Sequence, residues 1–258
     1  MSNPIYVVDA FTSSPFTGNP AGVCVLQAEQ STEWMQSVAA EMKHAETAFV
    51  RPIDGGFELR WLTPTVEVDL CGHATLATAH TLWESGRHPK NSHLHFHTRS
   101  GILTAKLDNE IELDFPRIDN FEAMLPHAIV GLQPIWTGKN GMDWFVEVET
   151  EEELRNFEPD FTNINSLGLR GLTVTSRGKE TFDFVSRFFA PQSGVPEDPV
   201  TGSAHCSLAP YWSAKLGKSE MRGFQASQRG GEVGVLVEGD RVKLRGRAVT
   251  VLEGTLRC

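Results

Sequence analysis

The feature that most constrains the fold of this chain is a pattern that occurs twice. The first copy runs from Phe57 to Gly86 and the second from Phe184 to Gly217. Each copy begins with a strand-like aromatic stretch that contains an arginine and stops at a proline. An acidic loop, a Gly-X-Ala element and an alanine-rich stretch with a tryptophan follow in the same order. We therefore expect two domains of the same plan, produced by duplication.

Each Gly-X-Ala element predicts the first turn of a buried helix. Small and apolar residues recur at helical spacing after Gly72 and after Gly202, and charge is scarce on every face. Gly86 and Gly217 suit the left-handed position that ends a helix. The remaining segments alternate as strands do, so we expect a sheet curled around a helix once per half. Residues 31–43 predict a further, amphipathic helix.

Composition restricts the classes of partner. The 258 residues are 40% hydrophobic and 22% charged, which is typical of a globular protein. A formal net charge of −10 argues against nucleic acid or an anionic membrane as a partner. No apolar run approaches the roughly 20 residues that span a bilayer, and the N-terminal stretch lacks the pattern of a signal peptide. The cysteines form no CxxC motif and are expected to be free thiols in a cytoplasmic protein; they are Cys24, Cys71, Cys206 and Cys258.

Two carboxylates are candidates for chemistry. Glu46 lies in "HAETAFV" and is expected to share a strand face with Ala48 and Val50. Burial there would raise its pKa toward neutrality and make it a usable proton shuttle; the alternative is a solvated charge at a strand end. Asp198 precedes a proline, which favours extended backbone outside the helix and places the carboxylate to face a ligand. The neighbouring Glu197 is expected to serve the loop structurally.

The two helix starts are candidates for anion binding. The first turn of a helix leaves backbone N–H groups without intrahelical partners. Glycine lets a ligand approach the backbone, and His73, Thr201 or Ser203 could add a side-chain donor. An anion site would follow if both helix starts met at the seam between the halves. The alternative is that small residues only allow tight packing.

Other patterns indicate no metal or cofactor. His93, His95 and His97 share a strand face, but no acid or cysteine lies at a useful spacing. Cys71 and His73 are two residues apart at a helix start, so we expect their side chains to diverge rather than form a nucleophile–base dyad. The chain contains no GxSxG element, P-loop or GxGxxG motif, and no lysine motif for pyridoxal phosphate.

Four motifs together resemble one known family, the PhzF-like isomerases of phenazine biosynthesis, within the diaminopimelate epimerase superfamily. They are "DAFTSSPFTGNPAGV", "HAETAFV", "LTPTVEVDLCGHATLA" and "FFAPQSGVPEDPVTGSAHCSLA", in family order over nearly the whole chain. The resemblance implies an α+β fold of two pseudo-symmetric domains, each a β-barrel around a central helix, with a cofactor-free active site in the cleft between them. We expect one domain over residues 1–115, completed by 249–258, and the other over 116–248. It also implies a homodimer.

The resemblance further implies a reaction. The founding activity is the isomerisation of trans-2,3-dihydro-3-hydroxyanthranilate by proton transfer. We therefore expect an isomerase that moves a proton within a small carboxylate substrate. The catalytic residues implied by the family motifs are Glu46 as acid/base, with His73 and Asp198. The implied substrate-binding residues are Cys71, Gly72, Thr201, Gly202 and Ser203.

Two alternatives remain open from the sequence. Epimerases and racemases of the superfamily use two cysteines, one at each helix start. Here Cys71 occupies the first position and Thr201 the second, and a hydroxyl cannot replace a thiolate as base. Two-thiol epimerisation is thus disfavoured, although Cys71 with another partner is not excluded. The other alternative is a non-catalytic protein that binds a small molecule, against which the presence of both Glu46 and Asp198 argues.

Overall fold

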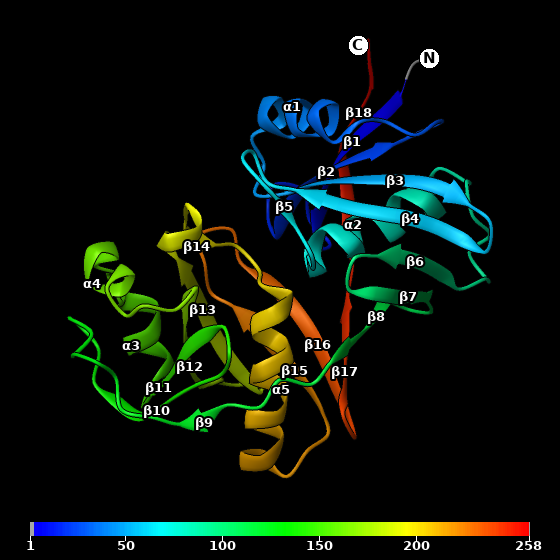
Figure 1. Cartoon of the computed structure of the whole chain (residues 1–258). Coiled ribbons are helices and arrows are strands. Elements are labelled where there is room, and N and C mark those ends of the chain that lie inside the picture. Colours follow the sequence, from blue (N-terminus) through cyan, green and yellow to red (C-terminus); the bar gives the residue numbers. More distant parts are fainter. Residues whose placement is uncertain (1–2, 258) are drawn as a thin grey trace. The chain divides into compact units, whose positions relative to one another are not determined.

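The computed structural model describes residues 3–257, which form two compact units. Unit 1 takes in the chain up to Phe115 and again from Arg245 onward, and unit 2 is Pro116–Leu244 (Figure 1). No helix in the described part of the chain is long and apolar enough to cross a membrane. Cys24, Cys71 and Cys206 are buried and make no disulfide, and Cys258 lies outside the described residues.

Unit 1 is a sheet-rich body with two helices. In chain order its elements are β1 (Asn3–Ala10), β2 (Asn19–Val25), α1 (Thr32–Met42), β3 (Thr47–Ile53), β4 (Gly56–Leu62), β5 (Glu67–Val68), α2 (Gly72–Glu84), β6 (Leu94–Thr98), β7 (Gly101–Leu107), β8 (Ile111–Pro116) and β18 (Ala248–Leu256). The C-terminal β18 pairs antiparallel with β1, so the last residues of the chain complete the unit that the first residues begin. The predicted helix over 31–43 is present as α1, and the Ser31 hydroxyl accepts from the Trp34 N–H as its N-cap.

Unit 2 repeats this order of elements. They are β9 (Phe121–Glu122), β10 (Pro134–Lys139), β11 (Asp143–Val148), α3 (Glu151–Asn156), α4 (Phe161–Asn165), β12 (Gly171–Arg177), β13 (Phe184–Ala190), η1 (Pro191–Ser193), β14 (Val195–Asp198), α5 (Gly202–Leu216), β15 (Glu220–Gln225), β16 (Gly231–Glu238) and β17 (Arg241–Gly246), whose last two residues belong to unit 1.

The strand pairings of the two units correspond one to one. In unit 1, β2 is parallel to β3, and β4 is antiparallel to β3 and β5 but parallel to β6. In unit 2, β11 is parallel to β12, and β13 is antiparallel to β12 and β14 but parallel to β15. Helices join each pair of parallel strands, as chain geometry requires. The duplication predicted from sequence is therefore present as a duplicated topology.

One long helix is buried in each unit. In α2 every residue from Gly72 to Ala79 is buried, and the helix packs against β1, β2, β3 and β18. In α5 the residues from Ala204 to Pro210 are buried, and the helix packs against β15 and β16. Gly86 and Gly217 have φ of 69° and 66°, the left-handed conformation predicted for the helix ends. Apolar contact on all sides accounts for the scarcity of charge in both sequences.

An arginine at the same position of each copy holds the short strand that precedes the buried helix. Arg60 of β4 donates to both carboxylate oxygens of Glu67 at 2.7 and 2.6 Å. Arg187 of β13 donates to both carboxylate oxygens of Glu197 at 2.7 and 3.0 Å. Bidentate pairs of this kind fix direction as well as distance. Glu197 therefore has the structural role in the loop that the sequence predicts.

A proline inside α5 marks a difference between the copies. Pro210 has no N–H, so the Cys206 carbonyl lacks the usual intrahelical donor. The Ile118 N–H donates to that carbonyl at 3.1 Å, and the Asn120 side chain donates to the Ser207 carbonyl at 3.2 Å. The segment that enters unit 2 is thereby hydrogen-bonded along its buried helix.

Candidate functional site

A first group of reactive side chains lies at the start of α2 in unit 1. Cys71 is the N-cap residue of the helix, and His73 is in its first turn. Glu46 immediately precedes β3, the strand that packs against this helix. The Cys71 Sγ lies 3.5 Å from His73 Nδ1, and His73 Nε2 lies 3.4 Å from a carboxylate oxygen of Glu46. The imidazole ring therefore connects the thiol to the carboxylate.

The contact between Cys71 and His73 corrects the prediction that these side chains diverge. Divergence at a spacing of two residues holds where both residues have helical backbone. Cys71, however, is an N-cap with φ −148° and ψ 109°, which is extended. Its side chain does not follow the helical rotation, and it turns back toward the ring of His73.

The surroundings of this group keep the imidazole neutral. Cys71 is 6% exposed and His73 is 4% exposed, whereas the Glu46 side chain retains 19% of its exposure. Burial, and secondarily the nearby His44, lower the pKa of His73 to about 3. Its Nε2 has no aligned hydrogen-bond partner among the described residues, because the 3.4 Å contact with Glu46 is off-axis. A neutral ring can donate at one nitrogen and accept at the other.

Glu46 contacts a residue of α2 for a different reason from the one that the sequence predicts. The sequence predicts that Ala48 and Val50 form one apolar face of a strand that begins near Glu46. The strand begins one residue later, at Thr47, and is buried on both faces. Phe49 packs with α1 residues on one side, so Ala48 points to the other side, where α2 lies. Glu46 lies two residues before Ala48, so its side chain is on the same side of the extended chain as Ala48.

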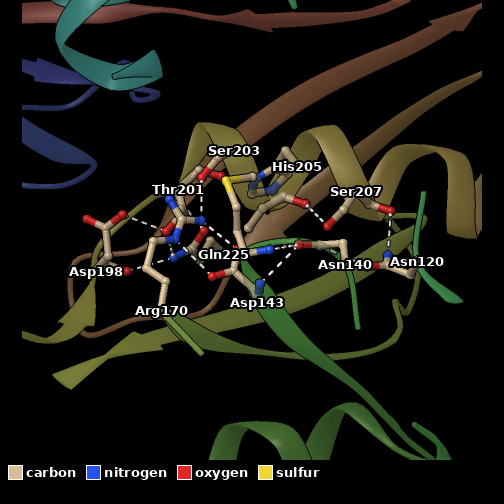
Figure 2. Close-up of polar contacts among 12 residues, drawn as sticks. Asn120, Asn140, Asp143, Arg170, Asp198, Thr201, Ser203, His205, Ser207 and Gln225 are labelled. Carbon is tan, nitrogen blue, oxygen red and sulfur yellow. Dashed lines mark hydrogen bonds and ion pairs between the residues drawn. The ribbon is translucent and has the colours of Figure 1, made fainter. Parts of the chain in front are cut away.

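A second group lies at the start of α5 in unit 2. Thr201 is the N-cap of that helix, at the position that Cys71 has in α2, and Asp198 ends β14 outside the helix as predicted. The Thr201 hydroxyl donates to Asp198 at 2.6 Å. Gln225 closes the loop, because its Oε1 accepts from the Thr201 N–H at 2.8 Å and its Nε2 donates to the Asp198 carbonyl at 2.6 Å. Figure 2 shows these side chains together beside the first turn of α5.

An arginine that no sequence motif predicts extends this group. Arg170 donates to the Ser203 hydroxyl at 3.0 Å and to both oxygens of the buried Asp143 at 2.9 and 2.5 Å (Figure 2). The Ser203 oxygen accepts from Arg170, so the serine proton can be donated to another group. Arg170, Asp143 and Gln225 come from three separate segments, and no local pattern marks them. An isolated Asp at the start of an apolar strand is the one available signal.

The three histidines that the sequence does not predict to bind a metal lie at β6: His95 and His97 are in the strand, and His93 precedes it. His95 is exposed, whereas its neighbours Leu94 and Phe96 are buried. Within residues 3–257 the triplet is not part of a group with metal-ligand geometry. The group that does have such geometry is Glu46, Cys71 and His73, whose ligand atoms lie within 4.8 Å of one another.

A buried histidine at the base of the second group gives a pH-dependent prediction. His205 donates from Nδ1 to the Thr201 carbonyl at 2.8 Å and is fully buried. Burial lowers its pKa from 6.5 to about 4. Between these values the unfolded chain binds a proton that the folded chain does not, so stability is lost as the pH falls through this window.

We expect His205 to account for about 2 kcal/mol of the unfolding free energy lost between pH 7 and pH 5. Urea unfolding of the wild type and of His205→Asn at both pH values measures this. The variant should lose about 2 kcal/mol less than the wild type over that interval. His95→Asn, at an exposed position, is the control and should follow the wild type. Equal losses for wild type and His205→Asn would contradict the assignment.

Comparison with known proteins agrees with this fold. The family model described as phenazine biosynthesis-like protein matches residues 8–254. An uncharacterized isomerase of Halalkalibacterium halodurans is 50% identical over 99% of both chains. A crystal structure of a PhzF-family phenazine biosynthesis protein from Enterococcus faecalis covers 100% of both chains at 39% identity, with a TM-score of 0.95. A hydroxyproline epimerase from Agrobacterium vitis, at 10% identity, shares the fold over 99% of this chain and 92% of its own, with a TM-score of 0.66.

The duplicated topology with one long buried helix per unit is thus the diaminopimelate epimerase-like fold, and the protein is an isomerase. Within that class the chain belongs to the phenazine biosynthesis-like family.

Proposed function

We propose that the protein is a cofactor-independent isomerase that moves a proton within a small carboxylate substrate, with Glu46 as the acid/base. The observation that carries this proposal is the contact of the Glu46 carboxylate with His73. The ring is neutral and buried at the N-terminus of α2, and the carboxylate retains partial exposure, so it can meet a substrate. A carboxylate held beside a neutral ring, rather than beside a cation, can accept a proton and return it.

The chemical steps need one carboxyl group. Glu46 removes a proton from a carbon of the substrate, and the electron pair moves into the adjacent unsaturated or carboxylate system. The protonated Glu46 then delivers the proton to another carbon of the same molecule. Backbone N–H groups at Gly72 and His73, in the first turn of α2, favour the negative charge that develops between these steps. In this proposal His73 forms one wall beside the carboxyl group, with its Nε2 3.4 Å from a Glu46 oxygen.

The group at the start of α5 in unit 2 offers hydrogen-bond donors and an acceptor of its own. Thr201 commits its hydroxyl proton to Asp198, whereas Ser203 retains a proton for a ligand. Gly202 and Ser203 also present the backbone N–H groups of a helix start. A carboxylate fits these donors, and a hydroxyl or ammonium group of the substrate fits the Asp198 carboxylate.

The test is a panel of small cyclic and unsaturated carboxylic acids incubated with the protein in deuterated water. We expect at least one acid to give an isomer with a displaced hydrogen, with deuterium at the carbon that receives it to the extent that Glu46 exchanges with solvent. Inversion of one stereocentre without any displacement would instead identify the epimerase alternative. Binding of acids with neither change would identify a non-catalytic protein.

A further inference from the structure

We propose that Glu46, Cys71 and His73 form a binding site for a divalent zinc ion. The sequence indicates no metal, because its one histidine cluster, the triplet around β6, has no acid or cysteine at a useful spacing. The structure instead brings together a thiol, an imidazole and a carboxylate from the start of α2 and the residue before β3. These are the three kinds of protein ligand that zinc uses.

The distances between the ligand atoms fit a zinc ion. Zinc bonds of about 2.0–2.3 Å in a tetrahedral arrangement place neighbouring ligand atoms roughly 3.3–3.6 Å apart. The Glu46 oxygen and His73 Nε2 are 3.4 Å apart, and Cys71 Sγ is 3.5 Å from the other nitrogen of the ring. All three ligand atoms lie within 4.8 Å of one another. The thiol would leave its contact with Nδ1 to reach an ion shared with Glu46.

The ligand atoms, above all His73 Nε2, are also in a state that favours coordination of an ion. His73 Nε2 is buried and has no aligned hydrogen-bond partner among the described residues, which is a costly state for a ring nitrogen unless another group approaches it. Coordination would satisfy it. Three protein ligands leave a fourth position for water or another small ligand, the arrangement of an open zinc site. A thiolate also favours zinc over the harder magnesium and calcium ions.

Zinc at this position would occupy the carboxylate that the proposed function uses as a base. The consequence, which rests on that proposed function, is reversible inhibition by zinc that a chelator relieves. Zinc binding itself is measured without any substrate. Failure of the metal proposal and failure of the proposed function are therefore distinguishable.

The experiment is calorimetric titration of the chelator-treated, full-length protein with zinc, followed by cobalt(II) as a spectroscopic probe. We expect one zinc ion per chain with a Kd of the order of 1 µM, and release of protons, because a thiol must lose its proton to ligate the metal. Cobalt(II) should give an intense near-ultraviolet band from a thiolate–metal bond.

Variants separate this site from other cysteines and histidines. Cys71→Ser should weaken zinc binding by about 100-fold or more and abolish the cobalt band. Serine is a favoured N-cap residue, so the variant is expected to fold, and thermal unfolding checks this: zinc should raise the Tm of the wild type and leave that of Cys71→Ser unchanged. His95→Gln, in the β6 triplet, and Cys206→Ser, in α5, are matched controls that should bind zinc as the wild type does.

Three results would overturn the proposal. They are no saturable binding below about 100 µM zinc, equal affinity in the wild type and Cys71→Ser, and a cobalt spectrum without the thiolate band. Loss of binding in His95→Gln would assign the ion to the histidine triplet instead.

Discussion

Turnover of the Glu46→Gln variant is expected to fall by about 10²–10⁴-fold, while ligand binding largely persists. Glutamine keeps the size of glutamate and can still contact His73 Nε2, which lies 3.4 Å from the carboxylate in the wild type. It cannot accept a proton from carbon. Steady-state kinetics on the substrate that the acid panel identifies should therefore show the loss in kcat, with KM little changed.

Asp69→Asn is the matched control for Glu46→Gln. Asp69 belongs to the loop that leads to Cys71, and its side chain is 73% exposed. Neutralising it removes one charge near α2 without touching the proposed base, so kcat should stay within about twofold of the wild type. If Glu46→Gln handles a confirmed substrate as fast as the wild type, Glu46 is not the base. Asp198 would then be the next candidate.

The largest loss of stability is expected from Arg187→Met, at about 3–5 kcal/mol. The arginine is 9% exposed, pairs with both oxygens of Glu197, and donates to the carbonyls of Leu154 and Phe157 at 3.3 and 2.6 Å. Methionine fills much of the volume but leaves the Glu197 carboxylate without its bidentate partner and two carbonyls without this donor. Urea unfolding at pH 7 measures the difference.

The corresponding arginine of the other copy provides the control. Arg60→Met should cost less, about 1–2 kcal/mol, because Glu67 also pairs with Arg99 at 2.7 Å and Arg60 is 22% exposed. The order of the two losses is the decisive result. Equal losses, or a loss below about 1 kcal/mol for Arg187→Met, would show that burial of the second ion pair does not govern its contribution.

The sequence predicts those features that depend on local order. The helix starts at Gly72 and Gly202, the left-handed glycines that follow the helices, and the extended backbone of Asp198 are set by neighbours in the chain. The duplication can be recognised from the sequence because the two copies share the same order of residues, whatever contacts those residues make. For the same reason the sequence predicts the structural role of Glu197, which pairs with Arg187.

What the sequence does not predict depends on contacts between distant segments. Arg170 reaches Ser203 across 33 positions, and Gln225 reaches Thr201 across 24. Spacing rules assume regular backbone, so they give the wrong geometry for Cys71 and His73, where one member is an N-cap. The two-sided burial of β3 depends on α1 and α2, which are not part of the strand's own local pattern and pack against it in the folded unit.

Pro210 shows how a duplicated domain can accommodate the chain that joins its copies. Two identical modules would leave the connecting segment without a place to bond, because each helix would satisfy its own carbonyls. Pro210 leaves the Cys206 carbonyl of α5 without its intrahelical donor, and the Ile118 N–H donates to that carbonyl instead. The connecting segment is thus held by a carbonyl that a helix without a proline would have used for itself.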